Sequence, residues 1–162
     1  MENPIEQLSS EDVLKRYSLV SGSGDAAFAL NSFDRALQSA GVGNLNLVKV
    51  TSILPPGVIP GNRAELPDGA VVYAAIGSIT SDRKDDLLSA SVAVGIPADR
   101  NAPGVIMEGG AKGSADVLEK EVRAMAWQAL KDRGLEVAEI KSVSVEHKVR
   151  NKGTALTAVL LW

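Results

Sequence analysis

The stretch AVVYAAIGSITSDRKDDLLSASVAVGI (residues 70–96) carries the clearest information on the fold class. Residues 70–80 and 88–96 are rich in small and β-branched side chains, which favour β-strands, and the charged segment 81–86 between them is typical of a turn. Further strands are expected on both sides of this pair, at residues 17–20, 45–52 and 104–108. Residues 57–68, which follow Pro55-Pro56, are expected to form an irregular loop.

Helical spacing of apolar residues predicts two helices. Residues 28–40 form the first, which ends at Gly41 and whose apolar face is expected to consist of Leu30, Phe33, Leu37 and Ala40. Residues 114–133 form the second, which begins at a capping Ser114 and ends before Gly134. A short helix is also expected from Ser10 to Arg16.

The C-terminal part predicts a β-hairpin, with strands at 137–149 and 154–162 joined by a turn at 151–153. His147 alternates with valines on one face of the first strand, which favours a packed, hydrogen-bonded core histidine over a catalytic base. Because the strands come in pairs and only two helices are long, the pattern favours an α+β fold, with sheets covered by helices, over a regular βαβ succession.

Composition excludes several functional classes. With 162 residues, of which 45% are hydrophobic, the chain is expected to form one domain, 1–162. The absence of cysteine excludes disulfides and thiolate metal sites, and with a single histidine any metal site would consist almost wholly of carboxylates. No metal site is expected. A net charge of −3 argues against nucleic-acid binding. No apolar run is long enough for a membrane span, and the polar, acidic N-terminal stretch is unlike a signal peptide, so a cytoplasmic location is expected.

Two glycine-rich segments bear on nucleotide binding. Residues 41–44 follow a helix and precede a strand, whereas a dinucleotide-binding fingerprint needs a strand before the helix. Residues 109–114 have the required order but lack the lysine position of a phosphate-binding loop. A flexible connection is the favoured interpretation there, and an anion at the start of the following helix stays open.

Thr51-Ser52 permits a specific self-cleavage reaction. A serine hydroxyl can attack the preceding carbonyl carbon and convert the peptide bond into an ester. Elimination then cuts the chain and leaves dehydroalanine, which hydrolyses to a pyruvoyl group and ammonia. On local pattern alone, a hydroxyl pair at the end of a strand is an ordinary turn element.

Six segments extend this observation: LNSFDRAL (30–37), AGVGNLNL (40–47), VTSILPP (50–56), GVIME (104–108), VEH (145–147) and the final LW (161–162). Together they resemble the pyruvoyl-dependent arginine decarboxylases, from about residue 19 to the end of the chain. Some members of that family have serine where this chain has Thr51, which changes little because this residue contributes only its carbonyl group.

The resemblance implies a role for particular residues. Ser52 corresponds to the serine that becomes the pyruvoyl cofactor, with cleavage after Thr51 into chains 1–51 (β) and 52–162 (α). Glu108 corresponds to the general acid, Asn46 to the asparagine of the processing and cofactor environment, and Asp34 to the acid that binds the substrate guanidinium. The implied fold is an αββα sandwich of two β-sheets flanked by helices, assembled as a homotrimer.

The implied reaction converts L-arginine to agmatine and CO2 through an imine with the pyruvoyl group. Two alternatives remain open from the sequence: the same chemistry on another amino acid, and a trimeric scaffold that no longer processes itself. In a straight strand Asn46 and Ser52 would lie roughly 20 Å apart, which is too far for both to belong to one site. Either the chain bends between them, or they belong to sites that are shared between subunits.

Overall fold

Two β-sheets stack face to face and form the centre of the computed structural model, which describes residues 14–162. The first sheet contains, in spatial order, β2 (Asn46–Lys49), β5 (Val71–Ser81), β9 (Lys152–Leu161), β1 (Arg16–Ala26) and β4 (Ile59–Pro60). The second sheet contains β3 (Ile53–Leu54), β7 (Gly104–Lys112), β6 (Leu87–Pro97) and β8 (Val137–Lys148). The long strands pair antiparallel, whereas the short strands β2 and β4 pair parallel with β5 and β1.

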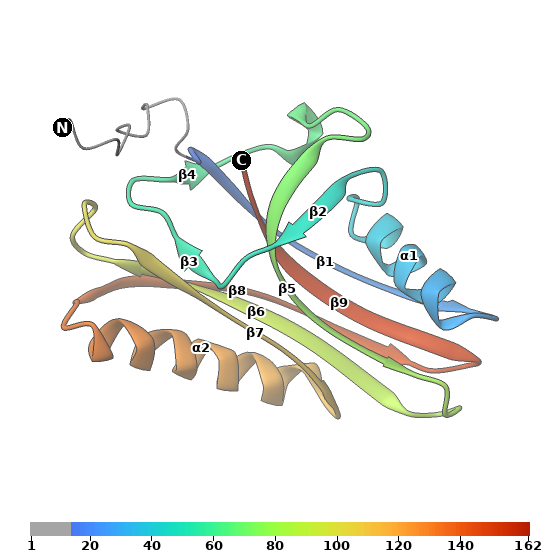
Figure 1. The fold of residues 1–162 in the computed structure, drawn as a ribbon. Helices are drawn as coiled ribbons and strands as arrows, with labels where there is room; N and C mark the ends of the chain where they lie inside the picture. The colour runs from blue at the N-terminus through green and yellow to red at the C-terminus, as the bar shows by residue number, and fades with distance from the viewer. Residues whose placement is uncertain (1–13) are drawn as a thin grey trace, which may run out of the picture.

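One helix covers the outer face of each sheet, which gives four layers (Figure 1). Helix α1 (Ala29–Ser39) packs on the first sheet, and helix α2 (Ala115–Asp132) packs on the second. The layer between the sheets is apolar and draws side chains from both of them, among them Ala75, Val92, Val94, Ile106, Val159 and Leu161. The predicted α+β class and the αββα sandwich are therefore confirmed.

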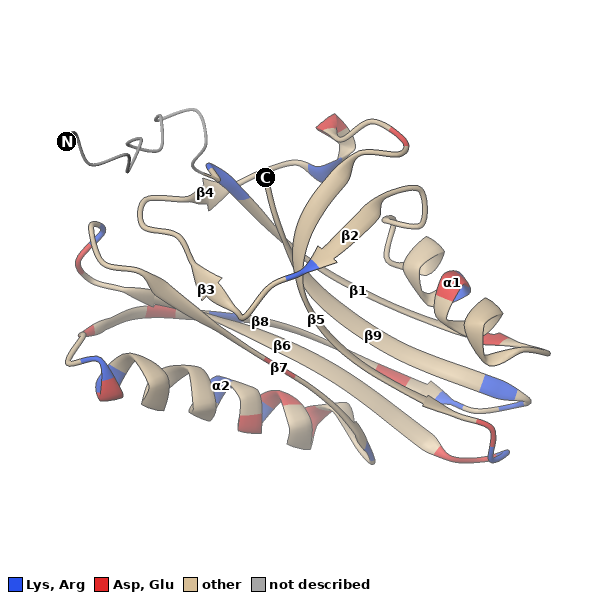
Figure 2. Cartoon of the chain, viewed as in Figure 1, with Lys and Arg blue, Asp and Glu red and all other residues tan. Residues whose placement is uncertain are grey.

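Charged residues lie away from this centre. Figure 2 shows them at strand ends, in turns and along α2, while the middle of the central strands is almost free of charge. Strand β9 is buried along nearly its whole length because α1 covers one of its faces and the second sheet covers the other. This placement explains why its sequence is apolar without strict alternation.

The C-terminal hairpin prediction is wrong, although both strands exist. Strand β8 pairs with β6 in the second sheet, whereas β9 pairs with β1 and β5 in the first, so residues 149–151 carry the chain from one sheet to the other. The apolar face of α1 is also predicted incorrectly at one position. Leu30 is 78% exposed, and the small side chains of Ser32 and Ala36 face the sheet instead.

Glycines in β1 explain the orientation of α1. A Cβ atom added to Gly22 would lie 2.3 Å from the carbonyl oxygen of Ala36, so the helix backbone rests directly on the strand. Only small residues of the helix can occupy such a contact, and the larger Leu30 therefore points outward.

Three further predictions need adjustment. The expected helix from Ser10 to Arg16 falls mostly outside the described residues, and its last residue begins β1. Residues 57–68 contain β4 and a short 3₁₀ turn, η1 (Arg63–Glu65). Residues 109–112 are no flexible connection, because they continue β7 in regular pairing with β6.

Candidate functional site

The Thr51-Ser52 peptide lies where the chain passes from one sheet to the other. Strand β2 ends at Lys49 in the first sheet, and β3 begins at Ile53 in the second (Figure 1). Both strands are at the edges of their sheets, so this crossing is open on one side. The chain therefore changes sheets between Asn46 and Ser52, so the two residues do not lie in one straight strand.

Ser52 has an unusual backbone conformation. Its φ angle is +74°, in the left-handed region that non-glycine residues rarely adopt. Holding a serine there costs roughly 1–3 kcal/mol, and the surrounding structure must supply the compensation. One contribution is visible, because the backbone N–H of Ile106 donates a hydrogen bond of 2.9 Å to the Ser52 carbonyl oxygen.

The Ser52 hydroxyl is paired with Glu108. Its Oγ donates to Oε1 of the carboxylate at 2.6 Å, and both residues are partly buried. Glu108 lies on β7, opposite Val92 of β6, and a Cβ atom added to Gly77 of β5 would come within 3.2 Å of the Glu108 Cβ. The two sheets thus approach closely beside the carboxylate and fix its strand against β5.

A cavity of about 240 Å³ opens at this pair. Thr51, Ser52 and Glu108 line it, together with residues of β3, β7 and α2. Most of its remaining wall is apolar and consists of Ile53, Val105, Ile106, Met107 and Met125. The structure therefore brings together the two residues that were predicted to be catalytic, Ser52 and Glu108.

The other two predicted site residues lie elsewhere in the chain. Asp34 is exposed on α1, where its carboxylate accepts a hydrogen bond of 2.6 Å from Gln38 Nε2. Asn46 is exposed at the start of β2, and its amide donates to the carbonyl oxygen of Gly69 at 2.9 Å. Neither residue lines the cavity of Ser52.

His147 is held in a second polar cluster. Its Nε2 lies 3.0 Å from Oδ2 of Asp25, and the side chains are only 12% and 11% exposed. The Asp25 carboxylate also accepts backbone N–H groups of Arg150 and Asn151, at 2.8 and 2.9 Å. Burial alone would raise the pKa of Asp25, but the hydrogen bonds from Arg150, His147 and Asn151 outweigh it and hold this pKa below its usual value. The expectation of a packed, hydrogen-bonded histidine agrees with this geometry.

The start of α2 already has a carboxylate. Ser114 is the N-cap residue, but its side chain makes no capping hydrogen bond. Instead, Glu146 Oε2 of β8 accepts the Ala115 N–H at 2.9 Å. A protein carboxylate thus takes the place that an anion would occupy at a helix N-terminus.

Sequence reasoning missed two residues of the cavity, Met125 and Arg133. Met125 lies within α2 and Arg133 directly follows it, and their sequence positions identify them only as part of a helix. Their proximity to Ser52 follows from the packing of α2 against β7, which no local pattern shows. Among residues 14–162, no helix is long and apolar enough to cross a membrane.

The comparison with known proteins first defines a class. The sequence model of the family described as pyruvoyl-dependent arginine decarboxylase matches residues 16–162, which include every element of the fold and the crossing at Ser52. The name of this class specifies a covalently bound pyruvoyl group as its cofactor.

Individual relatives agree with that match. A pyruvoyl-dependent arginine decarboxylase from Methanocaldococcus jannaschii is 43% identical over 145 residues, which cover 90% of this chain and 88% of the relative. Proteins of the same name from Methanococcus maripaludis and Pyrococcus abyssi are 42% and 31% identical, and the matches cover 90% and 91% of this chain and 88% and 94% of those relatives. The chain belongs to the pyruvoyl-dependent arginine decarboxylase family, which confirms the resemblance noted in the sequence.

Proposed function

We propose that this protein cleaves itself between Thr51 and Ser52 and then decarboxylates L-arginine to agmatine and CO2. One observation carries the proposal: a strained serine, with φ at +74°, donates its hydroxyl hydrogen bond to a carboxylate in a cavity at the edge of the sheets. The names of the relatives supply arginine as the substrate.

The cleavage uses groups that are adjacent in the chain. Ser52 Oγ attacks the carbonyl carbon of Thr51, the C–N bond between the two residues breaks, and the proton of the hydroxyl ends on the Ser52 nitrogen. Loss of the Ser52 Cα proton then breaks the Cβ–Oγ bond, so residues 1–51 leave with a carboxylate. Water converts the remaining dehydroalanine to the pyruvoyl group and ammonia. Release of the backbone strain at Ser52 favours this sequence of steps.

Glu108 is assigned a role before and after cleavage. In the intact chain its carboxylate accepts a hydrogen bond from Ser52 Oγ, so it is placed to take the hydroxyl proton when the oxygen attacks. In the mature protein the same side chain would return a proton to the Cα atom of the substrate after CO2 leaves. The pyruvoyl group supplies the carbonyl that accepts the electrons of the broken bond.

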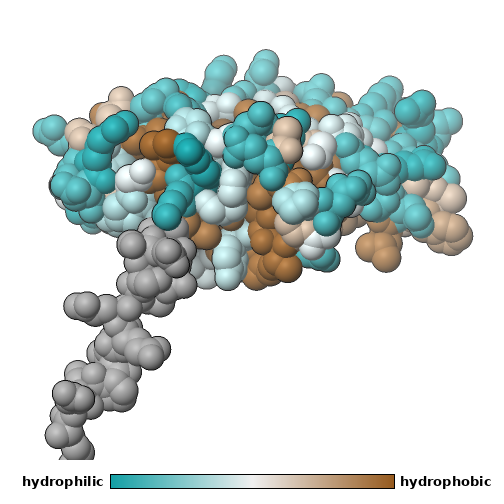
Figure 3. Space-filling model, turned by 90° about the horizontal axis from the view of Figure 1, so that it is seen from above, coloured by the Kyte–Doolittle hydropathy of each residue, from teal (hydrophilic) through white to brown (hydrophobic). Residues whose placement is uncertain are grey.

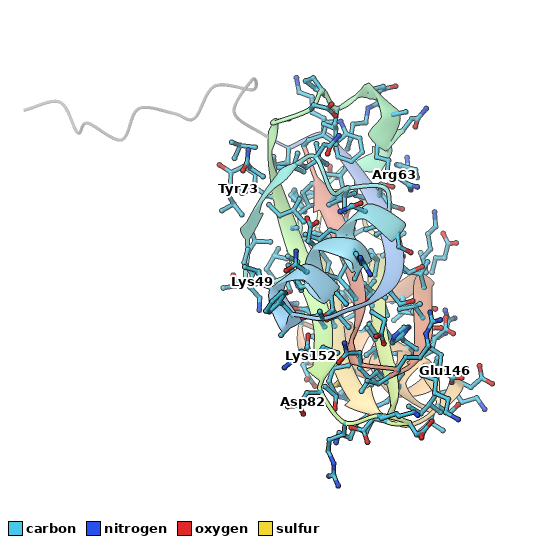
Figure 4. All side chains as sticks on the ribbon, turned by 90° about the vertical axis from the view of Figure 1, so that its right-hand side faces the viewer. Lys49, Arg63, Tyr73, Asp82, Glu146 and Lys152 are labelled. Carbon is cyan, nitrogen blue, oxygen red and sulfur yellow. The ribbon has the colours of Figure 1, made fainter. Side chains whose placement is uncertain are left out.

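An uncovered part of the first sheet supports the proposed homotrimer. Leu47, Val72 and Ala74 face α1, so their neighbours on β2 and β5 point to the opposite face, toward the layer between the sheets. The second sheet does not cover that end of the face, and its side chains remain 42–67% exposed at Val48, Val71 and Tyr73. Figure 3 shows that hydrophobic residues reach the surface on the side seen from above, and Figure 4 shows Tyr73 and Lys49 on one side of the molecule. A neighbouring copy that covers this surface would bury it.

The trimer would also complete the site. Asn46 lies on the same exposed face as Val48, and Asp34 lies one helical turn from Leu30, which is 78% exposed. Since neither polar residue reaches the cavity of its own chain, contact between copies is the route by which they would join a site. A carboxylate matches a guanidinium by two parallel hydrogen bonds, which suits Asp34 to the distal end of arginine.

The mass of the purified protein tests the proposal. We expect two chains, residues 1–51 and 52–162, with the second one blocked at its N-terminus, and release of agmatine from arginine without added pyridoxal phosphate. Light scattering of the unmodified protein should give the mass of three cleaved protomers. The Ser52→Ala variant should remain intact and inactive.

Each alternative has its own outcome in this experiment. An intact chain that is active would disprove the cleavage, and an intact, inactive trimer would identify a scaffold. A cleaved protein that prefers ornithine or lysine would move the activity to another amino acid. A reaction on a free amino acid is consistent with the cytoplasmic location expected above.

A further inference from the structure

The cavity at Ser52 holds two charged side chains of opposite sign. Glu108 supplies the negative charge from β7, and Arg133, which follows the last turn of α2, supplies the positive one. Within residues 14–162, no other lysine or arginine lines this cavity, and the rest of the wall is apolar or carries hydroxyl groups. Any anion that enters would therefore find a single cation beside it.

Most hydrogen-bond donors of the Arg133 side chain are not used by one identified contact. Its Nη1 donates to the carbonyl oxygen of Ala129 at 2.8 Å, which fixes the guanidinium beside the end of α2. A guanidinium has five N–H donors, so four remain for other partners. Among residues 14–162, no carboxylate forms an ion pair with Arg133, and Glu108 is instead bonded to Ser52.

The substrate brings a charge that the other site residues do not match. Arginine carries an α-amine, a guanidinium and an α-carboxylate, and only the first two have partners in the proposed mechanism. An unpaired carboxylate beside Ile53, Met107 and Met125 would lose part of its hydration without compensation. A guanidinium pairs with a carboxylate through two parallel hydrogen bonds, which supplies that compensation.

We infer that Arg133 binds the α-carboxylate of the substrate and thereby selects the amino acid over its decarboxylated product. This inference rests on the function proposed above. It assigns the carboxylate end of the substrate to the α2 side of the cavity and the guanidinium end to the opposite, open side. Because negative charge leaves the carboxylate as CO2 forms, the contact strengthens binding of the substrate and weakens in the transition state.

Steady-state kinetics and direct binding on Arg133→Gln test this assignment. We expect the KM for arginine to rise about tenfold or more while kcat stays the same or rises, since the lost contact is stronger in the bound substrate than in the transition state. The dissociation constant of agmatine, measured by calorimetry on the cleaved variant, should stay within twofold of the unmodified protein, because agmatine has no carboxylate. Arg133→Lys keeps the charge but loses the paired donors, so its KM for arginine should lie between those of the unmodified protein and Arg133→Gln.

Lys131→Gln is the matched control. It removes a positive charge from the last turn of the same helix, but Lys131 lies over the Trp127 ring, 5.7 Å from its centre, and does not line the cavity. This variant should keep the KM of the unmodified protein. Thermal unfolding and the mass of the cleaved chains show whether each variant folds and matures, and Arg133→Lys serves in place of Arg133→Gln if the latter does not.

Two results would overturn the assignment. An unchanged KM in Arg133→Gln would place the carboxylate elsewhere, and equal weakening of arginine and agmatine would mean general damage to the site. If the unmodified protein neither cleaves nor decarboxylates arginine, the proposed function falls and this inference falls with it. Normal kinetics of the variant, in a protein that cleaves and decarboxylates, would overturn the inference alone.

Discussion

Two acidic side chains lie where strands of different sheets meet, and they differ in how completely they are satisfied. Asp25 accepts three hydrogen bonds, from His147 and from the backbone N–H groups of Arg150 and Asn151. Glu108 accepts one from Ser52, whose own backbone is in the left-handed region. The first cluster joins β1 to β8 and the turn after it through three hydrogen bonds, and the second places a hydroxyl and a carboxylate beside a cavity.

This difference shows why the presence of a carboxylate or a histidine does not by itself identify a candidate active site. His147 is the single histidine of the chain, yet its ring is bonded to Asp25 and packed against Gly153, where an added Cβ would lie 2.7 Å from the ring. The proposed site combines a strained backbone at Ser52, an open sheet edge and a carboxylate that accepts a single hydrogen bond. Variants of Glu108 and Asp25 should separate a role in the reaction from a role in stability.

The largest effect is expected from Glu108→Gln. The amide keeps the shape of the side chain and can still accept the Ser52 hydrogen bond, but it cannot take or deliver a proton. The kcat should fall by about 10²–10⁴, the usual contribution of a positioned general acid. Self-cleavage should also slow, since the hydroxyl loses its proton acceptor.

A time course of chain masses, followed by kinetics on the cleaved fraction, measures both effects. Thermal unfolding should change little, because only one hydrogen bond is altered. A cleaved Glu108→Gln protein with the kcat of the unmodified enzyme would move the proton donor to another group, such as the hydroxyl of Tyr73.

A substitution in the Asp25 cluster should lower stability and leave activity unchanged, the opposite of Glu108→Gln. Asp25→Asn removes the charge and leaves one acceptor oxygen for groups that two oxygens now serve. Hydrogen bonds to charged groups contribute roughly 1.5–3 kcal/mol, so the free energy of unfolding at neutral pH should fall by about that amount. Cleavage and kcat should be unaffected, because Asp25 is outside the cavity.

The pH dependence of unfolding checks the cause. The pKa of Asp25 is lower in the folded protein, so its stabilisation is complete above the unfolded pKa of about 4 and is lost as the pH falls through the folded value. Urea unfolding at pH 7 and pH 3 should therefore show a large difference between the two proteins at pH 7 and a smaller one at pH 3. An equal difference at both pH values would mean that packing, rather than charge, holds the cluster together.

Local sequence patterns predict the elements of this fold better than their pairing. The strands at 70–80 and 88–96 and the helix at 114–133 are predicted within a few residues, because their periodicity reflects the faces that they bury. The C-terminal pairing was predicted incorrectly since β8 and β9 satisfy a hairpin pattern and only the competition with β1, β5 and β6 separates them.

For the candidate site too, the sequence predicts individual residues better than their contacts in space. Ser52 and Glu108 were predicted from the family resemblance, and the structure adds their contact, which joins residues 56 positions apart. The roles of all four residues stay predictions, and the side chains of Asp34 and Asn46 are each hydrogen-bonded to a neighbour outside the cavity. Arg133 has no sequence signal, since a basic residue at the end of a helix is ordinary and its role depends on how α2 lies on β7.

The smallest expected effect measures the strain itself. Ser52→Ala and Ser52→Gly both lack the hydroxyl, so both should stay uncleaved and can be compared as intact chains. Alanine keeps the steric conflict of a Cβ atom at a φ of +74°, whereas glycine adopts this angle without penalty. The glycine variant should therefore be the more stable of the two by about 1 kcal/mol, a difference between the left-handed penalty of alanine and the greater chain entropy of unfolded glycine. Urea unfolding of the two variants under one condition measures it. Since glycine is the less stable residue at an ordinary extended position, a more stable alanine variant would show that the junction relaxes and that strain does not drive the cleavage.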